Sequence, residues 1–384
     1  MMRSADVVAL PGEAGQTCLG TGIAWDDRRS ELVWVDTSRR LVHRARIGRD
    51  GRLRLVCTYN LPGRPGSITP VADDEGWVIA LERGLHLLRS DGSTLELVAA
   101  APPGVRMGDA ACDRRGRLWV GSMAEDEVTP IGALYRLDRN GELRMMVAGL
   151  IVASGIGWSP DGTTMYLADS GMQVVYSYPF DVERGELGKR RVLISLEDVD
   201  GTPDSVTVDA DGDIWIAMKG GHAIRRFAAG GSLLAVLHVP AEQVTSCAFG
   251  GRGFRSLYIT TMADTPDADQ WASDPDGGAL FRVETDASGR SALPFRPEPR
   301  WWARVAPAAP SQAAGPGSGY EIVVAGGHGS ILESAFPEFQ VTPEHGGRVH
   351  LVGNVIDRAA LHAALQRLHD LHLDVLELHR LSDP

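Results

Sequence analysis

Cysteine is scarce in this sequence, and long apolar runs are missing. The four cysteines lie far apart and form no C-x-x-C pair: Cys18, Cys57, Cys112 and Cys247. This spacing fits neither a zinc site nor a dense disulfide framework, so we expect a reducing, cytoplasmic location. No stretch approaches about 18 consecutive apolar residues, and Ser4 and Asp6 interrupt the N-terminal segment before an apolar signal region develops. The sequence therefore predicts a protein that neither crosses a membrane nor is exported.

Basic residues are also under-represented. The chain carries 38 Lys and Arg against 50 Asp and Glu, a formal net charge of −12. Such a charge opposes binding to nucleic acid or to an anionic membrane surface over long range. We therefore expect a small-molecule partner, which is neutral, cationic, or anionic with local screening.

Aromatic residues make up only 6% of the chain, whereas glycine (45) and proline (22) are abundant. This turn-rich balance excludes a helical bundle and favours many short strands. A string of an Asp/Gly-type turn followed by an apolar-aromatic strand occurs six times. Its aromatic residues, which we call the aromatic markers, are Trp34, Trp77, Trp119, Tyr166, Trp215 and Tyr258. Their spacing of about 42 to 49 residues is the length of one four-stranded propeller blade.

The repeat predicts an all-β six-bladed β-propeller over residues 1–290. Strands after such turns also occur in sandwiches, which remain the alternative. Residues 291–319 are rich in Pro, Ala, Gly and Ser and read as a linker, with Trp301 and Trp302 expected to dock on one of the two flanking bodies. Residues 320–384 predict a small α+β domain.

The expected order of elements in this last domain is βαββαβ, which is ferredoxin-like. The four strands are expected at 320–324, 339–342, 348–352 and 373–381, and the two helices at 330–336 and 357–371. A domain of about 65 residues is only marginally stable alone. We therefore expect this domain to dock, to form a homodimer or to hold a partner protein.

Six strings in the first region resemble the regucalcin/gluconolactonase family, also called the senescence marker protein family. They are LGTGIAW (19–25), GRLWVGSM (116–123), GIGWS (155–159), PDSVTVD (203–209), TSCAFGG (245–251) and LYITT (257–261). The resemblance covers about residues 1–286. It implies a six-bladed propeller and a lactone or ester hydrolase. It also implies one divalent metal at the centre, held by a Glu, an Asn and an Asp, with another Asn near the substrate.

Three of these four implied positions are substituted. Thr21 stands where the resemblance implies the metal-binding Glu, Ser154 where it implies the metal-binding Asn, and Gly108 where it implies the substrate-side Asn; the Asp remains, as Asp204. One carboxylate and two hydroxyls are a poor cage for Ca²⁺ or Mg²⁺, although the neighbouring Asp109 offers a second carboxylate. We therefore expect no tightly bound cofactor and at most a weak divalent cation, with Asp204 as its metal ligand.

The spacing of the repeat singles out the same places without the resemblance. About 11 to 13 residues before each marker stands a small or polar residue: Thr21, Ser67, Gly108 with Asp109, Ser154, Asp204 and Ser246. Six equivalent strands would bring these residues to the rim of a central funnel, where they bind a ligand or, in the alternative, merely let the strands pack around a narrow axis. Arg106, Lys219 and His222 are further candidates at the funnel mouth.

These residues predict a diverged lactonase or ester hydrolase that acts on a small cyclic or ester-bearing metabolite. Asp204, Ser154 and Asp109 are the catalytic candidates, with Asp204 as acid or base. The binding candidates are Thr21, Arg106, Ser67, Gly108, Ser246, Lys219 and His222. An isomerising or cyclising reaction fits the same residues. The alternatives are a non-catalytic binding or scaffold protein and a metal-dependent lactonase with substitute ligands.

Overall fold

The computed structural model describes residues 7–12, 16–72, 76–90, 92, 95–263, 274–305, 318–325, 332, 336, 339–344, 348–355, 368 and 373–381. The chain divides into two compact units, Met1–Pro307 and Ala308–Pro384. The domain boundaries that the sequence predicted at residues 290 and 319 stay predictions. In the part of the chain that the structure describes, no helix has the length and apolar character needed to cross a bilayer.

The first unit consists almost entirely of antiparallel sheet, in agreement with the turn-rich composition. Its described residues form six sheets. The first three are β2 (Gly20–Asp26), β3 (Glu31–Asp36), β4 (Leu41–Ile47) and β5 (Leu53–Asn60); then β6 (Pro65–Pro70), β7 (Trp77–Leu81), β8 (Gly84–Leu88) and β9 (Leu95–Ala100); then β10 (Val105–Cys112), β11 (Leu118–Ala124), β12 (Gly132–Leu137) and β13 (Leu143–Leu150).

The other three sheets follow the same plan. The fourth contains β14 (Ala153–Trp158), β15 (Thr164–Asp169), β16 (Val174–Asp181), β17 (Glu186–Leu187) and β18 (Arg191–Ser195); the fifth contains β19 (Thr202–Val208), β20 (Ile214–Lys219), β21 (Ala223–Phe227) and β22 (Leu233–His238); the sixth contains β23 (Val244–Gly250), β24 (Ser256–Thr261), β25 (Phe281–Glu284) and β1 (Val8–Ala9). Two short 3₁₀ helices lie at Ser170–Met172 and Arg252–Phe254.

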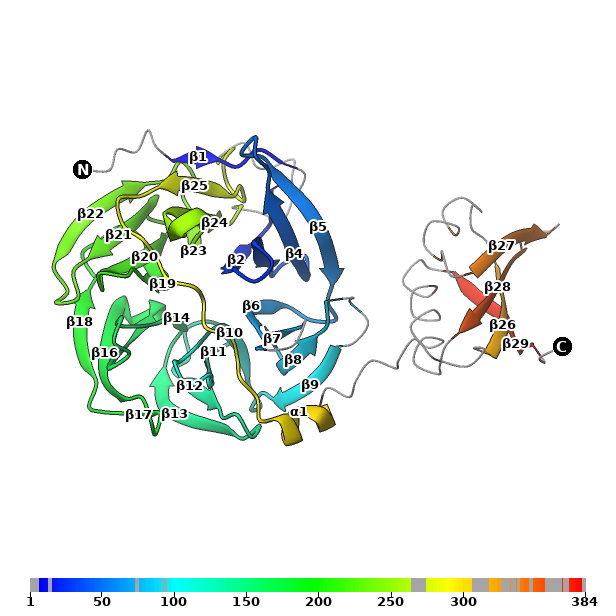
Figure 1. Ribbon diagram of the computed structural model, residues 1–384, viewed down its shortest axis with the longest axis horizontal. Helices are drawn as coiled ribbons and strands as arrows, with labels where there is room; N and C mark the ends of the chain where they lie inside the picture. The colour runs from blue at the N-terminus through cyan, green and yellow to red at the C-terminus, as the bar shows by residue number, and fades with distance from the viewer. Residues whose placement is uncertain are drawn as a thin grey trace. The chain divides into compact units, whose positions relative to one another are not determined.

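The first strand of each sheet lies innermost, and these six strands form a ring. Strands β2, β6, β10, β14, β19 and β23 each contact the next in this order, and β23 contacts β2 (Figure 1). Strand β1, from the start of the chain, pairs with β25, so the sixth sheet joins the two ends of the unit. The inner edge of every sheet therefore faces the centre of the ring, where residues from all six sheets converge.

The six aromatic markers explain why the repeat has this form. Each lies on the second strand of its sheet and is no more than 3% exposed. An arginine of the third strand lies over the ring in several sheets, as Arg226 does over Trp215 with 4.9 Å to the ring centroid. The Asp209 carboxylate at the turn accepts a hydrogen bond of 2.9 Å from the Trp215 indole. The turn and the marker are therefore joined by a buried contact, which is why they recur together.

A segment that we call the strap, residues 288–298, crosses the middle of the ring after the last strand of the sixth sheet (Figure 1). It leads to the helix α1 (Pro299–Val305). Both Trp301 and Trp302 pack against the buried Phe295 of the strap, with ring centroids 6.3 Å from it. The expected docking of the two tryptophans is thereby confirmed, and the body they contact is the first unit.

The second unit contains a four-stranded antiparallel sheet. Its strands are β26 (Ser318–Ala325), β27 (Phe339–Glu344), β28 (Arg348–Val355) and β29 (Asp374–Arg380), in the order β27-β28-β26-β29. All four lie where the sequence predicted strands. The predicted helices at 330–336 and 357–371 fall outside the described residues, apart from single positions.

Candidate active site

A cavity of about 240 Å³ lies at one end of the ring of inner strands. It brings together seven of the residues that the sequence predicted for the site: Thr21, Arg106, Gly108, Asp109, Ser154, Asp204 and Lys219. Ser67 and Ser246 line a different cavity, at the other end of the ring, and His222 lines neither. Hence the strand ends that converge here supply two carboxylates, two cations and several hydroxyls.

Each inner strand contains a β-bulge where it passes the centre, and these bulges place the two carboxylates. In β10 the register with β11 shifts between Met107 and Ala110, and in β19 the register with β20 shifts between Pro203 and Val206. Asp109 and Asp204 are therefore residues without a partner on the neighbouring strand. A bulge bends the strand and re-aims its side chains, so both carboxylates reach the centre of the ring.

Asp109 and Asp204 lie close enough to interact electrostatically. Burial and the neighbouring Asp204 charge raise the pKa of Asp109 to about 7, even though its carboxylate accepts a hydrogen bond of 2.9 Å from the Ala110 amide. Burial likewise raises the pKa of Asp204 to about 6, with the positive charge of Lys219 acting against this rise. One carboxyl is therefore held neutral in the pH range where the other is ionised, as in other interacting acid pairs.

The two cations of the cavity differ in their surroundings. The Arg106 guanidinium pairs with Glu127, a carboxylate that also lines the cavity. Lys219 has no ion pair among the described residues, and its charge acts on Asp204. It is one of only two lysines in the whole sequence, the other being Lys189. An ammonium group beside an ionised carboxylate suits a site where negative charge develops on a substrate oxygen.

Ser154 lacks the base that a nucleophilic serine needs. Its hydroxyl oxygen lies 2.7 Å from the Ser170 hydroxyl, and the Ser170 hydroxyl donates to the carbonyl of Pro203 at 2.5 Å. Because Ser170 has only one proton, Ser154 is the donor in their contact. Among the described residues no histidine lines the cavity. Ser154 is thus oriented to accept a hydrogen bond from a ligand rather than to attack it.

The structure adds Glu127 and Ser170 to the residues that sequence reasoning found. Ser170 directly follows β15, four residues after the marker Tyr166, and Lys219 stands four residues after the marker Trp215. Ser170 and Lys219 therefore occupy equivalent positions in the repeat, and Ser170 could have been found in the sequence from this equivalence. Glu127 lies in a longer loop after β11, with a φ of 54°, and no repeat position corresponds to it.

The residues at the centre fit a divalent cation poorly. Thr21 and Ser154 replace two of the implied ligands, and their hydroxyl groups bring no negative charge. The positive charge of Lys219 beside Asp204 opposes a second cation at that carboxylate. Within the described ranges, no group of three His, Cys, Asp or Glu side chains converges so as to hold a metal ion. Of the three carboxylates that line the cavity, Glu127 pairs with Arg106 and the pKa of Asp109 is raised to about 7, so few anionic oxygens remain for a hard divalent cation.

Comparison with known proteins gives matches for both units. Residues 19–263 match the model of the SMP-30/Gluconolactonase/LRE-like region, and residues 319–379 match a domain of unknown function (DUF8691). An uncharacterized protein of Sulfolobus acidocaldarius is 35% identical over 48% of this chain and 64% of its own length, so the chain spans less than two thirds of that relative. The pentonolactonase XacC of Haloferax volcanii is 31% identical over 71% of this chain and 92% of its own.

Among solved structures, a calcium-binding protein, regucalcin from Agrobacterium tumefaciens, superposes with a TM-score of 0.68. It is 27% identical, with 75% of this chain and 99% of that chain covered. Residues 19–263, which the family model matches, contain all six inner strands, whereas β1 and β25 of the sixth sheet lie outside that range. The family model covers more than half of the chain. This protein therefore belongs to the SMP-30/gluconolactonase/LRE-like family.

Proposed function

We propose that this protein hydrolyses a small lactone or related cyclic ester in the cavity that contains Asp109 and Asp204. The observation that carries the proposal is this carboxylate pair, whose pKa values are raised to about 7 and about 6. Between these values Asp204 is ionised while Asp109 keeps its proton. A base and an acid are thus present together in one cavity, which is what hydrolysis of an ester without an activated nucleophile requires.

The proposed reaction uses water as the nucleophile. Asp204 accepts a proton from a water molecule as its oxygen attacks the lactone carbonyl carbon. The negative charge on the carbonyl oxygen lies near the ammonium group of Lys219. When the tetrahedral intermediate breaks down, the bond to the ring oxygen is cleaved and Asp109 protonates that oxygen. Lactone and water give one hydroxy acid, and proton exchange with solvent restores Asp204 and Asp109.

We further propose that this turnover does not depend on a tightly bound divalent cation. The regucalcin from Agrobacterium tumefaciens is described as calcium-binding, but the donor set of this chain fits such an ion poorly. Here the Lys219 side chain supplies a positive charge that belongs to the chain, where a metal ion would be an exchangeable one. The hydroxyls of Thr21 and Ser154 and the guanidinium of Arg106 then bind the ring substituents and the carbonyl of the substrate.

The scaffold that we propose for this chemistry is a six-bladed β-propeller, each sheet of the first unit being one blade. Support comes from the closed ring of inner strands and from the N-terminal strand β1, which completes the last sheet. For the second unit we propose a ferredoxin-like fold. Its strand order β27-β28-β26-β29, fully antiparallel, is the order that a βαββαβ chain gives.

The test is a lactonase assay on the full chain with a panel of five- and six-membered aldonolactones, with and without excess EDTA. Asp204→Asn keeps the shape of the side chain and removes the base, while Asp198→Asn is a matched control at an exposed position outside the cavity. We expect EDTA-resistant turnover that falls at least about 100-fold in Asp204→Asn and is unchanged in Asp198→Asn.

Two results would contradict the proposal. Turnover that EDTA abolishes and Ca²⁺ or Mg²⁺ restores would show that a metal supplies the chemistry. A lactone that raises the melting temperature of the protein without being hydrolysed would instead identify a binding protein.

A further inference from the structure

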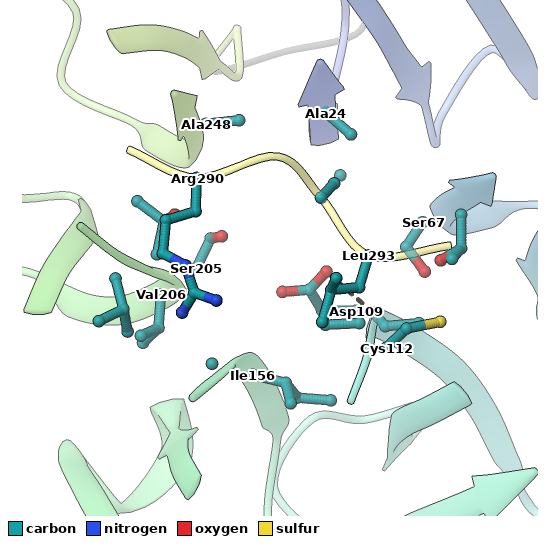
Figure 2. Close-up of a pocket in the computed structure, with 18 of the residues that line it drawn as sticks. Ala24, Ser67, Asp109, Cys112, Ile156, Ser205, Val206, Ala248, Arg290 and Leu293 are labelled. Atoms are coloured by element: carbon teal, nitrogen blue, oxygen red, sulfur yellow. Dashed lines mark hydrogen bonds between the residues drawn. The ribbon is translucent and has the colours of Figure 1, made fainter. Parts of the chain in front are cut away.

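A second cavity, of about 210 Å³, lies at the opposite end of the same inner strands (Figure 2). Its walls come from the later residues of these strands, such as Ile156 and Val206, and its cover is the strap. Asp109 and Ser205 line both cavities. More of its lining residues are apolar than in the first cavity, although Asp113 and Arg114 also line it.

Backbone hydrogen bonds hold the strap at both sides of this cavity, but not in the segment that passes over it. At one side the Ser288 carbonyl accepts a hydrogen bond of 2.8 Å from Ala210, and the Gly289 amide donates one of 2.8 Å to Phe254. At the other side the Phe295 amide donates to Pro70 at 2.9 Å. Between these anchors, residues 290–294 take part in no backbone hydrogen bond within the described part of the chain.

Gly289 and Phe295 are suited to these anchoring positions. A Cβ atom at Gly289 would lie 2.0 Å from the Cβ of Phe249, so only glycine allows the strap to approach the sixth sheet so closely. The Phe295 side chain is fully buried, in the core cluster between the second and third sheets. The strap is therefore a built cover over the cavity and not a loosely attached chain.

Arg290 brings a positive charge to this cavity. In Figure 2 its side chain extends from the strap into the space below. No ion pair or hydrogen bond is recorded for its guanidinium among the described residues. The only other cation in the lining, Arg114, donates to the Pro160 carbonyl instead. Burial and the charge of Arg114 both lower the pKa of Arg290, although the residue as a whole keeps access to solvent.

A hydroxyl proton is also available in the lining. Ser246 donates its proton to the Ser205 hydroxyl at 3.2 Å. The Ser205 proton is then free for another acceptor, because the described residues contain no acceptor for it. Ser205 is 8% exposed and lines both cavities, so its proton is available to an acceptor in this cavity. A guanidinium fork and a hydroxyl donor together match the two oxygens of a carboxylate.

We propose that the cavity beneath the strap binds a small carboxylic acid with an apolar body. Its carboxylate pairs with Arg290 and Ser205, and its apolar part lies against Ile156, Val206 and Leu293. One cation without a partner, Arg290, and the apolar side chains around it favour a monoanion over phosphate, which would bring two charges. The polyhydroxy acid that the proposed lactonase reaction releases does not suit these walls either, so this site takes a different class of ligand.

The test is calorimetric titration of the full chain with hexanoate, with hexanamide as the uncharged analogue. The variant is Arg290→Gln, and Arg252→Gln is the matched control, since Arg252 is an exposed arginine that lines neither cavity. Because Trp25 and Trp158 line the cavity, a change in tryptophan fluorescence reports binding there. We expect hexanoate to bind the unaltered protein and Arg252→Gln equally, and hexanamide to bind much more weakly.

In Arg290→Gln we expect hexanoate affinity to fall at least about tenfold. The exposed, unpaired position of Arg290 means that the variant should fold, which its melting temperature without ligand checks. Equal affinity in Arg290→Gln, or no binding of hexanoate to the unaltered protein at 20 mM or so, would overturn the proposal. Hexanoate binding is measured directly and needs no lactone turnover, so failure of the lactonase proposal would not be mistaken for failure of this one.

Discussion

The two ends of the inner-strand ring use the same six strands for opposite purposes. At one end Asp109, Asp204, Lys219, Arg106 and Glu127 gather in one cavity, and their charges act on one another. At the other end, the lining is mostly apolar under a strap that brings a cation without a carboxylate partner. The strands are common to both ends, so the difference comes from the side chains at each end of the strands and from the segments that lie over them.

This contrast shows that one scaffold can hold a cluster of charged residues at one end of its inner strands and a covering segment at the other. The cavity at the charged end is shaped by bulges and by loops after the second strands. The cavity at the strap end is lined in part by a segment from outside the repeat. Asp109 and Ser205 belong to both cavities, so the two ends meet at these residues. The experiments below compare the two ends, beginning with the largest expected effect.

Loss of the Phe295 side chain, which anchors the strap, should have the largest effect on the free energy of unfolding and only a small effect on lactone turnover. Phe295→Ala removes a fully buried ring, which typically lowers the free energy of unfolding by about 3–5 kcal/mol. Denaturant unfolding followed by tryptophan fluorescence measures it in the first unit, which holds all nine tryptophans. Lactone turnover at a temperature where the variant is folded should stay within about threefold. A variant as stable as the parent would show that the strap does not close the ring.

Stability should also depend on pH because both carboxyls of the charged end have raised pKa values. Folding favours the protonated form of each, so the free energy of unfolding is greatest near pH 4 and falls as the pH rises through about 6 and about 7. The expected fall is on the order of 2 kcal/mol per carboxyl. The Asp109→Asn variant should flatten the curve between about pH 4 and about pH 7, as thermal melts in a pH series would reveal. A parallel curve for the variant would argue against a buried acid.

The same two pKa values predict a narrow, bell-shaped pH profile of turnover. Activity requires an ionised Asp204 and a protonated Asp109, so kcat/KM should rise through about pH 6 and fall through about pH 7. Asp109→Asn should lower kcat by about 10- to 100-fold and remove the decline on the alkaline side. Initial rates from pH 4.5 to 9 measure both limbs. If the alkaline limb persists in the variant, another group is the acid.

The sequence carried enough information to locate each inner strand of the ring. The aromatic markers are buried at equivalent positions in all six sheets, so counting back from them locates the inner strands. Position along a strand was not enough to decide the cavity, however. Ser67 and Ser246 were expected beside Asp204, yet they line the strap end, because the bulges shift which face a residue presents.

The strap could not be predicted because it leaves almost no pattern in the sequence. Its composition resembles that of the Pro- and Ala-rich stretch that follows, so residues from 291 onward read as a linker. What holds it is a set of backbone hydrogen bonds and the single ring of Phe295, and neither has a periodicity. Glu127 was missed for a similar reason, since its loop has no counterpart in the other repeats.

Replacement of Lys219 should give the smallest effect of this series and the most specific one. The Lys219 charge lowers the pKa of Asp204, so Lys219→Met should raise it and move the acid limb of the profile to higher pH. If the ammonium also stabilises the oxyanion, kcat falls by about tenfold while KM changes little. Lys189→Met is the natural control, because Lys189 is the other lysine of the chain and is exposed.

The two consequences separate the roles of this lysine. A purely structural role would raise KM or lower the melting temperature but would leave the acid limb in place. A shift of that limb with unchanged kcat at its plateau would make Lys219 a residue that tunes Asp204 and nothing more. Only a shift of the acid limb of the pH profile together with a lower plateau value of kcat places the ammonium group at the carbonyl oxygen. The charged end of the ring, unlike the strap end, then has a cation next to a base.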